Sequence, residues 1–198
     1  MSKKGFTLAE ILVVIAVISI LGLLIVTIFS RTLRGTNKSQ IISAIKQNGQ
    51  AVLETMDKTI RGADNLVCIS NDPDNTIVVI KGGKYTRFRF QVYPDKTRNG
   101  IVFQDNPVAG LNDSDPKLFL KNKICNPQDP MSVTQTLTDN NSQTGVNLIS
   151  GSFKKSDPQP GFKDIVSIQF VLGPGVDAAK AVAGQIDEVS FQTSIELR

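Results

Sequence analysis

The sequence is dominated by an almost unbroken apolar run of 19 residues, 11–29, close to the amino terminus. A helix rises about 1.5 Å per residue and needs roughly 20 residues to cross a bilayer core, so the run predicts a transmembrane helix. One acid, Glu10, lies immediately before the run. A carboxylate in hydrocarbon costs on the order of 2.5 kcal/mol or more and usually has a partner. The chain supplies no such partner nearby, because no basic residue lies between Lys4 and Arg31.

Two simpler interpretations of this run explain less. A secretory signal peptide has an apolar core of about 7–15 residues followed by a small-x-small cleavage site, and the run is longer and lacks that site. A plain signal anchor fits the length but leaves Glu10 unexplained. Basic residues lie on both sides of the run, so the positive-inside rule does not orient it. They are Lys3, Lys4, Arg31, Arg34 and Lys38.

The residues before the run form a pattern of their own. Two lysines are followed by glycine, phenylalanine, threonine and leucine, and then by the acid: Lys3, Lys4, Gly5, Phe6, Thr7, Leu8 and Glu10. This start resembles the class III signal of type IV pilins and type II secretion pseudopilins. The resemblance implies cleavage between Gly5 and Phe6 by a prepilin peptidase, and N-methylation of Phe6 by the same peptidase/methyltransferase.

The resemblance also implies where the protein acts and what it contacts. The helix would anchor the chain in the inner membrane, in contact with lipid and the assembly platform, and would later form the fibre core with other subunits. Glu10 would contact the new amine of a neighbouring subunit, and the carboxy-terminal domain would be extracytoplasmic. The last dozen residues resemble the terminal strand of J-type minor pseudopilins, which favours a minor subunit. A major pilin is the alternative, and the sequence leaves open whether the fibre is a pilus, a secretion pseudopilus or a DNA-uptake machine.

The helical pattern continues beyond the apolar run. Apolar residues recur at spacings of three and four, as on one face of a helix, at positions 41, 42, 45, 52, 53, 56 and 60. Gly62 then marks the carboxy-terminal end. Gly22, Gly35 and Gly49 are weak points, each costing about 1 kcal/mol relative to alanine, and we expect any break near residues 35–37. The predicted segments are a leader at 1–5, a transmembrane helix at 6–30, an amphipathic helix at 31–62 and a β-rich head at 63–198.

From residue 71 onward, turn residues separate short β segments. Residues 71–75 form a turn cluster, and Gly82 and Gly83 predict a hairpin turn. The predicted strands are 77–80, 85–93, 101–104, 117–120, 146–149, 165–172 and 188–197, with a short helix or strand at 131–137 inside a long loop. The predicted fold is therefore α+β, a long amino-terminal helix packed on an antiparallel sheet.

The two cysteines, Cys68 and Cys125, have no C-x-x-C spacing and predict neither a zinc site nor a redox motif. In an oxidising compartment a disulfide is the natural interpretation, and it would add roughly 4 kcal/mol of stability by closing a long loop. Two buried free thiols are the alternative.

Residues 81–98 carry six basic residues and one acid, Asp95. In the predicted strand, Tyr85, Arg87, Arg89 and Tyr93 share one side. Such a face could hold phosphates and stack bases, so a DNA-binding or adhesive function is a second hypothesis. A solvated outer face of a hairpin has the same pattern. The net charge of +4 falls to +2 without the two leader lysines, which does not favour a protein that generally coats nucleic acid.

Catalysis and metal binding have little support in the sequence. The chain has no histidine and no G-x-S-x-G motif, so no catalytic residue, cofactor or metal is predicted, and a signal-anchored enzyme is a remote alternative. The aspartate pairs at 72 and 74 and at 113 and 115 could bind calcium, but turn chemistry explains them equally well.

Overall fold

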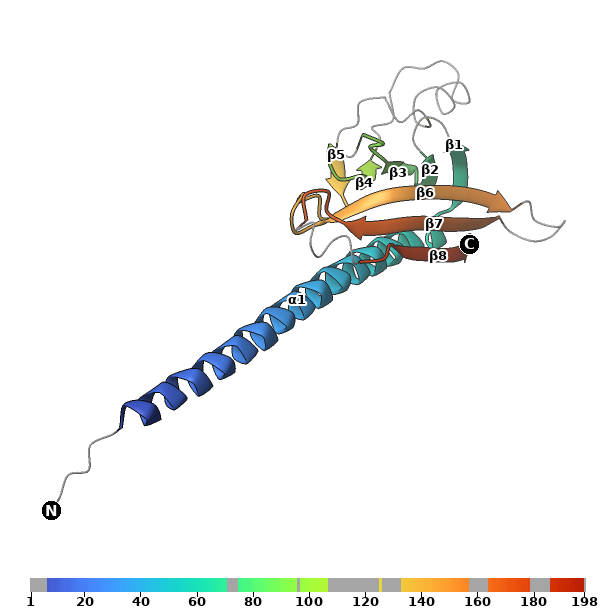
Figure 1. Cartoon of the computed structure of the whole chain (residues 1–198). Helices are drawn as coiled ribbons and strands as arrows, with labels where there is room; N and C mark the ends of the chain where they lie inside the picture. Colours follow the sequence, from blue (N-terminus) through green and yellow to red (C-terminus); the bar gives the residue numbers. More distant parts are fainter. Residues whose placement is uncertain are drawn as a thin grey trace. The chain divides into compact units, whose positions relative to one another are not determined.

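The structure is a computed structural model and describes residues 7–70, 75–95, 97–106, 125, 133–156, 164–178 and 186–197. The chain divides into two compact units, Met1–Gln40 and Ile41–Arg198. The first contains the amino-terminal part of one long helix. The second contains the rest of that helix and all eight strands that the structure describes (Figure 1).

The long helix, α1, spans Leu8–Arg61. It ends one residue before Gly62, whose amide donates to the carbonyl of Lys58 at 3.2 Å, so the predicted end is confirmed. The break expected near residues 35–37 is wrong, because the helix is continuous there. A single glycine costs only about 1 kcal/mol in a helix, and the uninterrupted hydrogen-bond ladder on both sides offsets that amount.

Five strands form an antiparallel sheet in the order β1-β2-β3-β4-β5. They are β1 (Asn65–Ser70), β2 (Asn75–Lys81), β3 (Lys84–Gln91), β4 (Ile101–Asn106) and β5 (Val133–Thr136). The predicted hairpin turn between β2 and β3 is confirmed, since Gly82 and Gly83 have φ values of 54° and 74°, which favour glycine. β1 was not predicted, because its sequence lacks a clear alternation of polar and apolar residues.

The remaining strands form a second antiparallel sheet in the order β6-β7-β8. They are β6 (Val146–Ser156), β7 (Ile165–Pro174) and β8 (Val189–Glu196), each overlapping a predicted strand. β6 contacts β1, β2, β3 and β4, so it crosses the first sheet instead of extending it. Two of the predicted segments, the strand at 117–120 and the turn residues 71–74, lie outside the described residues.

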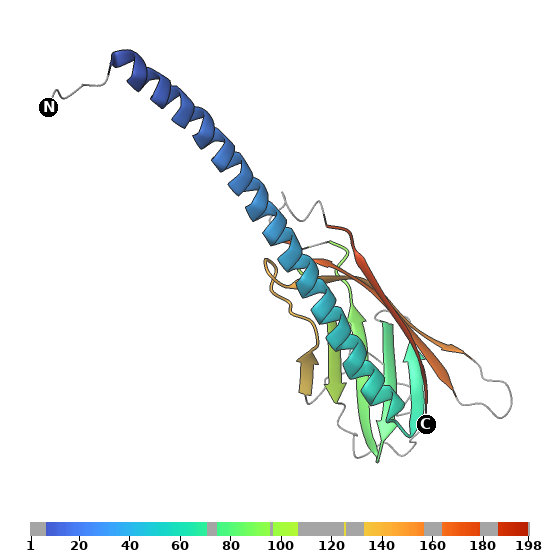
Figure 2. The ribbon, with the colours of Figure 1, turned by 90° about the horizontal axis from the view of Figure 1, so that it is seen from below.

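One core joins both sheets and the second half of α1. Ile45, Val52, Met56 and Ile60 form the buried stripe of the helix, in agreement with the predicted spacing. In Figure 2 this part of the helix lies over the five-stranded sheet, with β7 and β8 beside it. The Phe90 and Phe153 rings stack with centroids 4.5 Å apart, which ties β3 to β6. The predicted α+β layout of a long helix with an antiparallel β region is therefore confirmed.

Candidate functional site

The first turn of α1 is closed by a reciprocal pair of hydrogen bonds between Thr7 and Glu10. The Glu10 amide donates to Thr7 Oγ1 at 3.3 Å, and the Thr7 amide donates to Glu10 Oε2 at 2.9 Å. The Thr7 hydroxyl also donates to Glu10 Oε2, at 3.0 Å. This is a capping box, in which a threonine N-cap and a glutamate three residues later satisfy two free helix amides.

This role of Thr7 was not predicted, because the sequence shows no opposite charge close to Glu10. Amide and hydroxyl donors also stabilise a carboxylate, and the spacing T-x-x-E before an apolar run was the available signal. Glu10 is therefore held in a fixed position at the start of the helix by its own chain.

The apolar run itself is unusually exposed. Its large side chains have exposed fractions of at least 50% (Val17) and at most 72% (Leu23), so none of them is buried against other described residues. This helix is long and apolar enough to cross a membrane. Its polar side chains are satisfied internally: Ser19 donates to the carbonyl of Ile15 and Thr27 to that of Leu23, both at 2.8 Å. Such bonding suits a helix that has no water around it.

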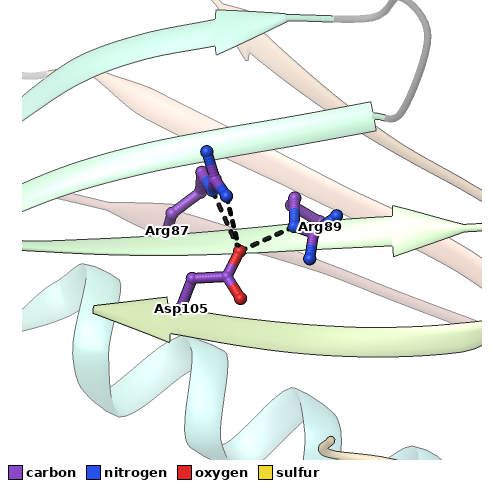
Figure 3. Close-up of polar contacts among 3 residues, drawn as sticks. All are labelled: Arg87, Arg89 and Asp105. Carbon is purple, nitrogen blue, oxygen red and sulfur yellow. Dashed lines mark hydrogen bonds and ion pairs between the residues drawn. The ribbon is translucent and has the colours of Figure 1, made fainter. Parts of the chain in front are cut away.

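The two arginines of the predicted basic face, which lie on β3, are covered in the structure. Arg87 is only 1% exposed, and Asp105 is completely buried beside it (Figure 3). Oδ2 of Asp105 accepts from Arg87 Nε at 3.0 Å and from Arg89 Nε at 2.6 Å. The side chain of Arg89 is 12% exposed. The expectation of an exposed basic face is therefore wrong for Arg87, and Arg89 is largely covered.

Strand register brings these residues together. Arg87 lies opposite Asp105 in the β3–β4 pair, so both side chains point to the same face of the sheet. The predicted strand ended at residue 104, one residue too early to include this acid. The guanidinium of Arg89 also lies 4.8 Å from the ring centroid of Phe103 on the same face. These contacts fix both arginines inside the fold.

The two tyrosines predicted beside these arginines are placed differently from each other in the structure. Tyr85 lies within β3 and is half-buried, whereas Tyr93 lies beyond the end of the strand. Arg98 stacks on Tyr93, with its guanidinium carbon 3.8 Å from the ring centroid. Nearby, hydrogen bonds from the Thr97 hydroxyl and amide lower the pKa of Asp95, which keeps this acid ionised among the basic residues. Of the four residues predicted as one binding face, Tyr85, Arg87 and Arg89 lie on one side of β3, and Tyr93 lies beyond the end of the strand.

Cys68 and Cys125 are joined in a disulfide, with their Cα atoms 6.2 Å apart. Cys68 lies opposite Val78, which lies opposite Arg87, so the bridge is attached to the sheet face that carries the arginine cluster. The bond fixes residue 125 at β1, although the segment that contains it connects β4 and β5 in the chain. It is thus a long-range link across the five-stranded sheet.

The described residues offer little for catalysis or metal binding. They contain no group of three or more histidine, cysteine, aspartate or glutamate residues that could hold a metal ion. A cleft of about 360 Å³ lies between Tyr93, Pro174 and Glu188, and its lining carries one carboxylate and no serine, cysteine or histidine. The aspartates considered for calcium, at 72, 74, 113 and 115, lie outside the described residues.

Comparison with known proteins gives one match, at the amino terminus. No curated protein and no solved structure matches the chain. Residues 1–26 match the family model described as the prokaryotic N-terminal methylation motif. The matched segment covers Gly5, Phe6, the Thr7–Glu10 cap and most of the exposed apolar run. The chain therefore begins with the signature of type IV pilins and pseudopilins.

Proposed function

We propose that this protein is the precursor of a structural subunit of a type IV pilus or a type II secretion pseudopilus. A prepilin peptidase cleaves it after Gly5 and methylates the new amine of Phe6. The helix first holds the chain in the inner membrane and then, at the assembly platform, packs with the helices of other subunits. The observation that carries this proposal is the exposed apolar run, most of which lies within the matched methylation motif.

In this proposal Glu10 pairs with the methylated amine of a neighbouring subunit. The capping box supports this role, because it holds the carboxylate at the helix start before any neighbour arrives. Among the described residues, Thr7 bonds only Oε2 of Glu10, which leaves Oε1 for an incoming N–H group. An ion pair of this kind would remove the cost of an isolated charge in the membrane.

Mass spectrometry of the protein from cells with an active prepilin peptidase tests the processing step. We expect a mature chain that begins with methylated Phe6, and we expect Gly5→Leu to leave the full leader in place. Glu10→Gln should still be cleaved but should be lost from sheared fibres. A wild-type chain that keeps Met1 would contradict the proposal.

We further propose that the β-rich head folds outside the cytoplasm. The Cys68–Cys125 disulfide supports this location, since such bonds persist in the bacterial periplasm and are rare in the cytosol. Trapping free thiols in intact cells with an alkylating reagent should leave both cysteines unmodified until a reductant is added. Modification of both without reductant would contradict the location.

Within this class we propose a minor subunit, supported by the likeness of the terminal strand, now β8, to that of J-type minor pseudopilins. Quantitative mass spectrometry of purified fibres should find this chain at a small fraction of the main subunit. An equal or greater abundance would instead identify a major pilin.

A further inference from the structure

Three basic residues follow the apolar run on one side of α1. Arg31, Arg34 and Lys38 are spaced by three and four residues, so at about 100° per residue they fall within roughly 60° of arc. Arg31 and Arg34 are exposed and Lys38 is half-buried. Among the ion pairs of the described residues, none involves any of the three. They form what we call the basic stripe.

The position of the basic stripe matches the surface of a membrane spanned by the run. The 19 residues of the run extend about 28 Å as a helix, close to the roughly 30 Å of a hydrocarbon core. Arg31 then lies about 3 Å and Arg34 about 7 Å beyond Phe29, within the headgroup layer, and Lys38 lies about 13 Å beyond Phe29, at the outer side of that layer. Their long side chains can keep an aliphatic stem on apolar surface and place the charge among phosphates.

The charges along the helix favour an anionic partner at this level. After Glu10, the next acid in the chain is Glu54, sixteen residues beyond Lys38. A second copy of the helix at the same height would therefore offer the basic stripe no carboxylate. In a bilayer the available anions at this depth are lipid headgroups, which attract basic segments that flank a membrane span.

We propose that the basic stripe binds anionic phospholipid headgroups at the membrane surface beyond residue 29. This inference rests on the proposed function, because it requires the run to span a bilayer. Binding at this site sets the depth and rotation of the helix before assembly, since the three charges lie on one face only. Extraction of the subunit into a fibre then requires these headgroups to be released.

The full-length chain in phosphatidylcholine vesicles provides the test, with spin-labelled phosphatidylglycerol or phosphatidylcholine as the probe. Electron paramagnetic resonance measures how much of each labelled lipid is immobilised beside the protein. We expect about a threefold preference for phosphatidylglycerol, because each basic residue at the surface attracts anionic lipid. In the triple variant Arg31→Gln/Arg34→Gln/Lys38→Gln, the part of the phosphatidylglycerol preference that exceeds a ratio of one should fall by at least half. The preference that remains is due to Lys3 and Lys4.

A matched control removes three exposed lysines far from the run in sequence, with Lys58→Gln/Lys84→Gln/Lys154→Gln. It changes the net charge by the same amount and should keep the full preference. Salt at 1 M, which shortens the screening length to about 3 Å, should abolish the preference. Inorganic phosphate at constant ionic strength should leave it unchanged, and its loss there would identify a site for free phosphate.

Flotation with phosphatidylcholine vesicles at 1 M salt tests the membrane span separately from the lipid preference. A chain that does not float lacks the membrane span, and the proposed function fails with the inference. A chain that floats but shows no lipid preference overturns the lipid inference alone, as does a triple variant that behaves like the wild type. Equal loss in the triple variant and in the matched control would show an effect of overall charge and would also overturn the specific site.

Discussion

A buried arginine needs its charge and its N–H groups to be met, because burying an unpaired ion is costly. Arg87 meets this need through Asp105, whose Oδ2 also binds Arg89. The other carboxylate oxygen, Oδ1, is buried and has no hydrogen-bond partner among the described residues. One oxygen therefore connects two guanidinium groups, and the loss of that carboxylate would break a charged contact of both arginines at once.

We predict that Asp105→Asn lowers the free energy of unfolding by about 3 kcal/mol or more, because it breaks a buried ion pair while preserving side-chain volume. Denaturation of the full chain in detergent micelles, followed by circular dichroism, measures this value. Asp57→Asn is the matched control, since Asp57 pairs with the exposed Arg61 at 2.7 Å. It should cost between about 0 and 1 kcal/mol. Equal losses in the two variants would contradict the structural role of Asp105.

At the scale of elements, the three glycines of α1 have different surroundings, although all three were predicted to be equivalent weak points of the helix. A methyl group at Gly22 or Gly35 would meet nothing within 4 Å. A methyl group at Gly49 would overlap the ring of Phe191 on β8. Gly49 therefore permits the close approach of the helix to the second sheet, whereas Gly35 has no such packing role.

We predict opposite effects for alanine at these two positions. Gly35→Ala should raise the stability of the full chain by up to about 1 kcal/mol through helix propensity. Gly49→Ala should lower it, because overpacking costs about 1–3 kcal/mol. Thermal unfolding in micelles compares the two. The double variant Gly49→Ala/Phe191→Leu should recover part of the loss, since it removes the overlapping ring. A stabilising Gly49→Ala would show that Phe191 moves aside freely.

At the scale of the whole molecule, the disulfide is the longest covalent constraint that the structure describes. It joins residues 57 positions apart and connects the edge strand β1 with a residue from the β4–β5 connection. Cross-links of this length stabilise mainly by restricting the unfolded chain.

We predict that Cys68→Ala/Cys125→Ala lowers the free energy of unfolding by roughly 4 kcal/mol. Treatment of the wild-type protein with a reductant should produce a similar loss, and the double variant should not respond to the reductant. Chemical denaturation with and without dithiothreitol gives both numbers. A wild-type protein whose stability is unchanged by complete reduction would rule out this contribution.

Local patterns were enough to predict much of the architecture. The spacing of Ile45, Val52, Met56 and Ile60 predicted the buried face of α1, and Gly82 and Gly83 predicted a turn that needs positive φ. These features depend on residues within a few positions of one another. The crossing of β6 over the first sheet and the burial of Arg87 were not predicted, because each depends on partners far away in the chain.

The sequence by itself determined three features of the amino-terminal part: a methylation motif, an apolar run of membrane length and a long helix that ends just before Gly62. Its elements are local, so periodicity and motif spacing are sufficient to read them. Only the tertiary structure decided that Arg87 and Arg89 bind a buried aspartate instead of forming an exposed face. The physical reason is strand register: the alternation in β3 assigns Arg87 and Arg89 to one face, but only the pairing with β4 places the buried Asp105 beside them.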